Sequence, residues 1–68
     1  MQVEIQESGP NDGLKAQTDG SGEVVLQHRE ERDGKWYIVT TRYRNSGKRG
    51  FSGFWLFTPY DTEVKKAP

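Results

Sequence analysis

The 68-residue sequence contains no cysteine and only one histidine, His28. Without cysteine the chain has no disulfide framework and no cysteine-based zinc site, and its composition fits the reducing cytoplasm. A lone histidine does not complete a Ser/His/Asp or Cys/His catalytic set, and only scattered carboxylates remain as metal ligands. The sequence therefore predicts a non-enzyme with no catalytic residues, no metal and no cofactor, in which His28 is a hydrogen-bonded structural residue.

Long apolar runs are also missing, since hydrophobic residues make up only 31% of the chain. No run approaches the length of a membrane span or of a signal-peptide core, so we expect a soluble cytoplasmic protein without a membrane partner. A chain this short forms one small core with a few kcal/mol of net stability. Tight aromatic packing or self-association would have to supplement that core, and the sequence leaves the oligomeric state open.

Charge is unevenly distributed along the chain, although the total charge is zero. Residues 1–33 hold eight acids against three bases, whereas no carboxylate occurs between Gly34 and Tyr60. That second segment contains five cations and all eight aromatic residues. Cations that can meet phosphates, interleaved with rings that can meet bases, indicate a nucleic-acid surface. The same composition also suits the aromatic core of a small β domain.

The pattern of residues predicts a mainly β fold, a small antiparallel meander of three to four strands. Residues 1–22 read as a short edge strand over 2–6 followed by a flexible acidic arm rich in Gly, Ser, Asn and Asp. Residues 23–68 form the β-sheet domain, with strands over 23–31, 35–44 and 53–58. Thr58 as a cap with Pro59 at the first helical position predicts a short C-terminal helix or tail.

The dipeptide Asp33-Gly34 predicts a tight hairpin between the first two long strands. A two-residue loop would pair Arg32 with Lys35 and so fix which residues share a face. One face would then be mostly apolar and form the core. The other would be mixed, and carry Val25, Gln27, Arg29, Glu31, Trp36, Ile38, Thr40 and Arg42.

The running order of residues 23–67 resembles one known family. The segments Gly34-Lys35-Trp36-Tyr37, Arg42-Tyr43-Arg44, Asn45-Ser46-Gly47-Lys48-Arg49 and Phe57-Thr58 are similar to the three-stranded, AP2-like DNA-binding domain at the amino end of phage and transposon tyrosine integrases. In that family the sheet lies in the major groove. The resemblance implies that Thr40 and Arg42 face the groove. It also implies that Arg44, Lys48 and Arg49 contact the DNA backbone on either side of the groove, and that Trp36 packs near the sheet edge.

A second resemblance covers only the segment from Arg49 to Phe57. Its order Arg-Gly-Phe-Ser-Gly-Phe-Trp-Leu-Phe is similar to the octamer of RNA-recognition motifs and to the Lys-Gly-Phe-Gly-Phe of cold-shock domains. This resemblance implies a surface that stacks single-stranded bases. Ser52 is an extra residue that interrupts the strand alternation of those rings.

We therefore expect a small domain that binds nucleic acid, duplex DNA ahead of RNA. The expected site comprises Arg29, Trp36, Thr40, Arg42, Arg44, Lys48 and Arg49. The alternative is a protein-interaction module, an inhibitor or assembly subunit, that uses exposed aromatics and a sheet edge. The third strand carries large apolar side chains on both faces, Trp55 and Phe57 on one and Phe54 and Leu56 on the other. This pattern favours the alternative, because a partner protein could bury the face that the core does not.

Overall fold

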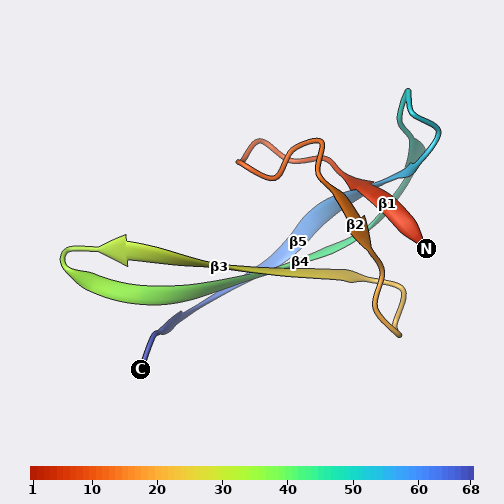
Figure 1. Cartoon of the computed structure of the whole chain (residues 1–68). Coiled ribbons are helices and arrows are strands. Elements are labelled where there is room, and N and C mark those ends of the chain that lie inside the picture. Colours follow the sequence, from red (N-terminus) through yellow and green to blue (C-terminus); the bar gives the residue numbers. More distant parts are fainter.

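A computed structural model describes all residues from Met1 to Pro68 and contains five β-strands and no helix. The strands are β1 (Gln2–Ile5), β2 (Lys15–Gln17), β3 (Val24–Arg32), β4 (Lys35–Arg49) and β5 (Trp55–Lys66). They form a single sheet in the order β2-β1-β5-β4-β3. The expected mainly β fold is confirmed. In Figure 1 the long strands β3, β4 and β5 extend away from the end where β1 and β2 lie.

The expected antiparallel meander accounts for β3, β4 and β5, and the remaining strands change the architecture. β1 pairs antiparallel with β2 but parallel with β5, through the partners Glu4 with Leu56 and Ile5 with Phe57. The sheet is therefore mixed and has five strands, where three or four were expected. A parallel contact joins segments about 50 residues apart, which no local pattern in the sequence specifies.

The β3–β4 hairpin has the register that Asp33-Gly34 predicts. Arg32 pairs with Lys35, and the pairing continues without a shift to Val24 and Tyr43. Asp33 has φ 51° and Gly34 has φ 77°, so both residues adopt the left-handed conformation of a type I′ turn. The two residues of this turn therefore determine which side chains of β3 and β4 share a face of the sheet.

The prediction of a C-terminal helix is wrong, because β5 continues through this segment to Lys66. Pro59 does not end the strand. The β4–β5 register shifts beside it, so that Tyr43 pairs with Pro59 and Arg42 with Asp61, and Tyr60 is an extra residue. A β-bulge on an otherwise unpaired edge is where a strand tolerates a residue that lacks a backbone donor.

Residues 1–22 contain more sheet than the sequence predicts. The strand expected at the amino end is present, but it lies between β2 and β5 in the interior of the sheet rather than at an edge. β2 falls within the segment expected to be an arm, and it pairs with β1 from Gln2 to Glu4. The segment between β1 and β2 turns back on itself, with Gly13 donating a backbone hydrogen bond to the carbonyl of Ile5.

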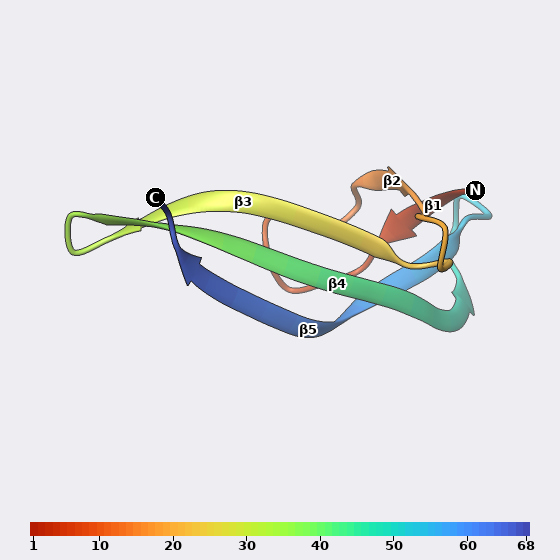
Figure 2. The ribbon, with the colours of Figure 1, turned by 90° about the horizontal axis from the view of Figure 1, so that it is seen from below.

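The core lies at one end of an elongated molecule that measures 41 × 24 × 16 Å. Only six side chains are buried, namely Val3, Ile5, Val24, Val39, Tyr43 and Phe57. Five of them form one cluster, which includes Val3 and Ile5 of β1, and Val39 lies apart from it. The outer half of β3, β4 and β5 therefore projects as a three-stranded arm, visible edge to edge in Figure 2. The structure contains no helix that could span a membrane.

Candidate interaction surface

One face of the β3–β4–β5 ribbon is uncovered, and we call it the open face. Val24, Val39, Tyr43 and Phe57 point to the core side, so the residues that alternate with them point the other way. Every side chain on the open face is exposed or half-buried. The face comprises Val25, Gln27, Arg29 and Glu31 of β3, Trp36, Ile38, Thr40, Arg42 and Arg44 of β4, and Thr58, Tyr60, Asp61, Glu63 and Lys65 of β5.

Five of the seven residues expected in the site lie together on this face. Arg29 lies beside Ile38, Thr40 between Gln27 and Glu63, and Arg42 between Val25 and Asp61. Trp36 occupies the outer end of the face, and Arg44 the end nearer the core. The amide of Gln27 donates a hydrogen bond of 3.0 Å to the hydroxyl of Thr40, which ties β3 to β4 across the middle of the face.

Lys48 and Arg49 are not part of this surface. They lie at the far end of β4, twelve residues or about 40 Å of extended strand from Trp36. The guanidinium of Arg49 stacks 4.2 Å from the Trp55 ring centroid and donates to the Gly53 carbonyl at 2.9 Å. The structure therefore leaves Lys48 and Arg49 off the open face, beyond the end that Arg44 occupies.

Carboxylates balance the cations on the open face. Because β5 is a strand rather than a helix, it brings Asp61 and Glu63 alongside the β4 residues. The Arg42 Nε lies 4.0 Å from the Asp61 carboxylate, and the Lys65 Nζ lies 3.0 Å from that of Glu63. Four cations (Arg29, Arg42, Arg44, Lys65) thus share the surface with Glu31, Asp61, Glu63 and the adjoining Glu23. With Glu23 included, the formal charges of this surface sum to zero.

Apolar and aromatic side chains occupy the rest of the open face. Trp36 is 51% exposed, Tyr60 40% and Val25 37%. Tyr60 is held in place from two sides, because its hydroxyl donates to Glu23 at 2.7 Å and the Arg44 guanidinium lies 4.9 Å from its ring centroid. The hydrogen bond to the Glu23 carboxylate, followed by partial burial, raises the pKa of the Tyr60 hydroxyl. The sequence missed Tyr60, although the alternating pattern that follows it could have indicated a strand.

The opposite face of the ribbon is partly covered by the segment between β1 and β2. Tyr43 donates its hydroxyl hydrogen to the Glu7 carboxylate, and the Asn11 amide donates to the same hydroxyl at 3.4 Å. Burial, followed by this contact with Glu7, raises the pKa of the Tyr43 hydroxyl. His28 lies on this side too, with its Nε2 3.2 Å from the Glu30 carboxylate, and is hydrogen-bonded as expected but exposed.

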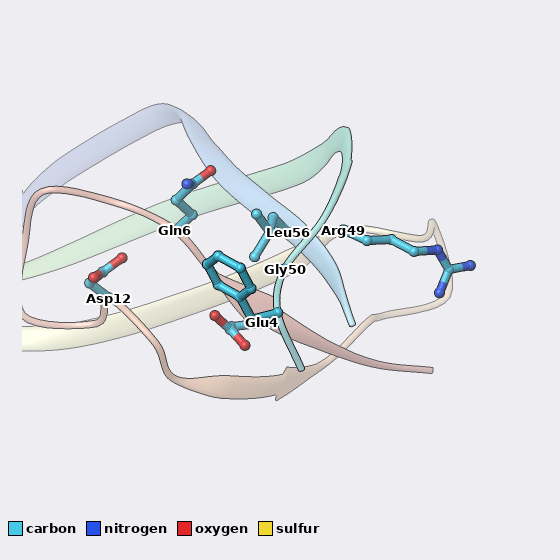
Figure 3. Close-up of a pocket in the computed structure, with 7 residues that line it drawn as sticks. Glu4, Gln6, Asp12, Arg49, Gly50 and Leu56 are labelled. Atoms are coloured by element: carbon cyan, nitrogen blue, oxygen red, sulfur yellow. The ribbon is translucent and has the colours of Figure 1, made fainter. Parts of the chain in front are cut away.

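A shallow hollow of about 360 Å³ lies between β1 and the β4–β5 loop. Figure 3 shows the side chains of Glu4, Gln6 and Asp12 around it, with Arg49 pointing away. Ser52 donates to the Glu4 carboxylate at 2.8 Å and Lys15 lies 3.2 Å from it, and these contacts lower the pKa of Glu4. Phe51, one of the rings in the segment similar to RNA-recognition motifs, is fully exposed in the adjoining loop. The Glu4 carboxylate in the hollow is thus already engaged by Ser52 and Lys15.

Two long strand edges of the ribbon have no partner. β3 is the last strand of the sheet, and β5 is covered by β1 only at Leu56 and Phe57. Beyond Phe57, β5 pairs with β4 alone. Unpaired backbone donors and acceptors along a strand edge are a template for another chain.

Comparison of the chain with protein-family models, with curated proteins and with solved structures finds no match.

Proposed function

We propose that the chain is a protein-interaction module whose open face docks against another polypeptide. The observation that carries this proposal is the uncovered three-stranded face itself. It combines exposed Trp36, Tyr60 and Val25 with four cations, which three carboxylates of the face and the adjoining Glu23 balance. Aromatic residues and arginine are enriched at protein interfaces, whereas a surface without net charge gives little attraction to a polyanion.

The shape of the arm supports the same proposal. A three-stranded ribbon needs a hydrophobic face packed against something to be stable. In the outer half of this ribbon only Val39 is buried, and no second layer covers the open face. A partner that packs on Ile38 and Trp36 would supply the missing layer.

The test is photo-crosslinking from the open face. Ile38, at the centre of the outer half of the face, is replaced by a benzophenone amino acid, and the same group is placed at the exposed Gln17 of β2 as a matched control. In an extract of the source cells we expect a covalent adduct of one defined size from position 38, and none from position 17. The added substitution Trp36→Ala should reduce the adduct severalfold. Equal labelling from both positions, or none from position 38, would contradict the proposal.

A second candidate, binding of duplex DNA, is favoured by one specific observation. Arg29, Thr40, Arg42 and Arg44 share the open face of three antiparallel strands, and β-strands can enter the major groove. The resemblance to integrase DNA-binding domains agrees with this candidate and remains a prediction. The cytoplasmic location also remains a prediction. Three arginine–phosphate contacts would give a log–log salt slope of about −3.

Fluorescence anisotropy with a labelled duplex of random sequence tests this candidate. The double variant Arg42→Glu/Arg44→Glu should abolish binding at low salt, whereas Lys48→Glu/Arg49→Glu, with the same change of net charge, should not. Equal loss in both variants would indicate attraction by total charge alone. No binding by the unaltered chain at low salt would leave protein interaction as the remaining function.

A further inference from the structure

The outer edge of β5 offers a pairing site that the chain does not use. From Thr58 to Lys66 the strand has β4 on one side and no strand on the other. β1 reaches only as far as Phe57, whose carbonyl accepts a hydrogen bond from the backbone of Gln6 at 2.9 Å. Another strand can therefore lie along 60–66 without meeting β1.

The backbone groups that face this edge follow from the β4–β5 ladder. Ala67 donates its backbone N–H to the carbonyl of Trp36 at 2.9 Å, which marks those residues as a hydrogen-bonded pair. Such pairs alternate along an antiparallel ladder, so Lys65 and Glu63 also bond towards β4. Thr62, Val64 and Lys66 consequently direct their N–H and C=O groups outward.

We infer that a second copy of this chain pairs along the β5 edge, antiparallel, with a two-fold axis at Val64. This goes beyond the proposed function, because the pairing uses the edge of β5 and leaves the open face uncovered. Val64 would exchange both backbone hydrogen bonds with its symmetry mate, and Thr62 would pair with Lys66 of the second copy. Glu63 and Lys65 would stand opposite each other twice, as close non-hydrogen-bonded pairs.

The charges along β5 select this register over its neighbours. An axis at Glu63 would set two carboxylates face to face, and an axis at Lys65 two ammonium groups. An axis at Thr62 would oppose Asp61 to Glu63 of the second copy. Like charges directly opposite each other destabilise a strand pair, whereas opposite charges stabilise it. Among these registers only the Val64-centred one brings opposite charges together at both close positions.

The same register also buries apolar surface. Val64 is 42% exposed, and its partner on β4 is Val39, which is 5% exposed. Symmetric pairing at Val64 would form a continuous row of four valines across the two arms. It would also join the two open faces into one six-stranded face, because a two-fold axis perpendicular to the sheet keeps corresponding faces on the same side.

The outer part of β3, from His28 to Arg32, lacks this self-complementarity. An axis at Arg29 opposes two guanidinium groups, and one at Glu30 or Glu31 opposes two carboxylates. An axis at His28 sets Val25 against Glu31 and Leu26 against Glu30. The inference is therefore confined to β5.

Sedimentation equilibrium with a charge swap tests the inference. The unaltered chain should form a dimer at high protein concentration. Glu63→Lys and Lys65→Glu should each weaken the dimer about tenfold or more, because each places like charges opposite each other at two positions. The double variant Glu63→Lys/Lys65→Glu restores both opposite-charge pairs, so it should recover the original dimer within about threefold. Lys48→Glu, at the other end of the molecule, is the control and should have no effect.

Circular dichroism of each variant establishes that the sheet is retained. Three outcomes would each overturn the inference. The unaltered chain could be monomeric at all concentrations up to about 1 mM, or its dimer could be unaffected by the single charge reversals. The dimer of the double variant could also be as weak as those of the single variants. These outcomes are independent of the photo-crosslinking from Ile38. An adduct with a different protein, together with a monomeric chain, would refute the dimer and leave the proposed function standing.

Discussion

At the scale of single residues, a few polar side chains hold the connecting segments to a very small core. Asp19 is the main example, since its Oδ1 accepts hydrogen bonds from Ser21 N at 2.9 Å, Ser21 Oγ at 2.6 Å and Glu23 N at 3.0 Å. These bonds close the turn between β2 and β3. The Ser21 hydroxyl first, and then the backbone amides of Glu23 and Ser21, lower the pKa of Asp19.

The depressed pKa of Asp19 predicts a loss of stability in acid. The stabilisation is present above the ordinary aspartate pKa of about 3.9 and is lost as pH falls through the lower folded-state value. We therefore expect Asp19→Asn to lower the unfolding midpoint at pH 6, with a difference from the unaltered chain that shrinks as pH approaches 2. Urea unfolding followed by tryptophan fluorescence at several pH values measures this difference.

Asp33→Asn is the matched control, because the Asp33 carboxylate accepts no hydrogen bond within the chain. Asparagine is also favoured at the first position of a type I′ turn, so this variant should be at least as stable as the unaltered chain at pH 6. A difference for Asp19→Asn that stays constant from pH 6 to pH 2 would mean that the ionised carboxylate is not what stabilises the turn.

At the scale of elements, the β3–β4 hairpin depends on its turn. A Cβ atom added to Gly34 would meet nothing within 4 Å, so the requirement for glycine there is purely conformational. With φ 77° at this position, Gly34→Ala should destabilise the chain by about 1 kcal/mol. Chemical denaturation measures the change. A matched substitution at Gly20, which has no positive φ and nothing within 4 Å, should cost less. Equal losses at both positions would rule out the turn conformation as the cause.

The sequence predicted this hairpin because its turn signal and its alternation are local. It failed at β5 because Thr58-Pro59 is also a good helix start, and the bulge that accommodates Pro59 depends on its pairing with β4. The consequence reached the candidate site. With the segment after Thr58 predicted to be a short helix or tail, Asp61 and Glu63 were not expected beside Arg42, and the sequence therefore indicated a more basic open face than the structure has.

At the scale of the whole molecule, the core was the least predictable feature. The pattern in residues 2–6 indicated a strand, but its parallel pairing with β5 joins the two ends of the chain and has no local signature. Val3 and Ile5 are fully buried as a result, although residues 1–22 contain only five apolar side chains. The amino-terminal segment is therefore part of the core that anchors the arm, rather than an appendage to the sheet.

The chain offers a direct test of this division, because its only two isoleucines lie in different places. Ile5 is 0% exposed in the core cluster, whereas Ile38 is half-buried on the open face. Ile5→Ala should cost about 2–5 kcal/mol, which is enough to unfold much of a domain whose total stability is only a few kcal/mol. Ile38→Ala should cost about 1 kcal/mol or less, because its site already reaches solvent. Urea denaturation compares the two variants directly. Similar losses would mean that the arm and its open face contribute as much to stability as the buried cluster, and the open face would then have a structural role rather than a binding one.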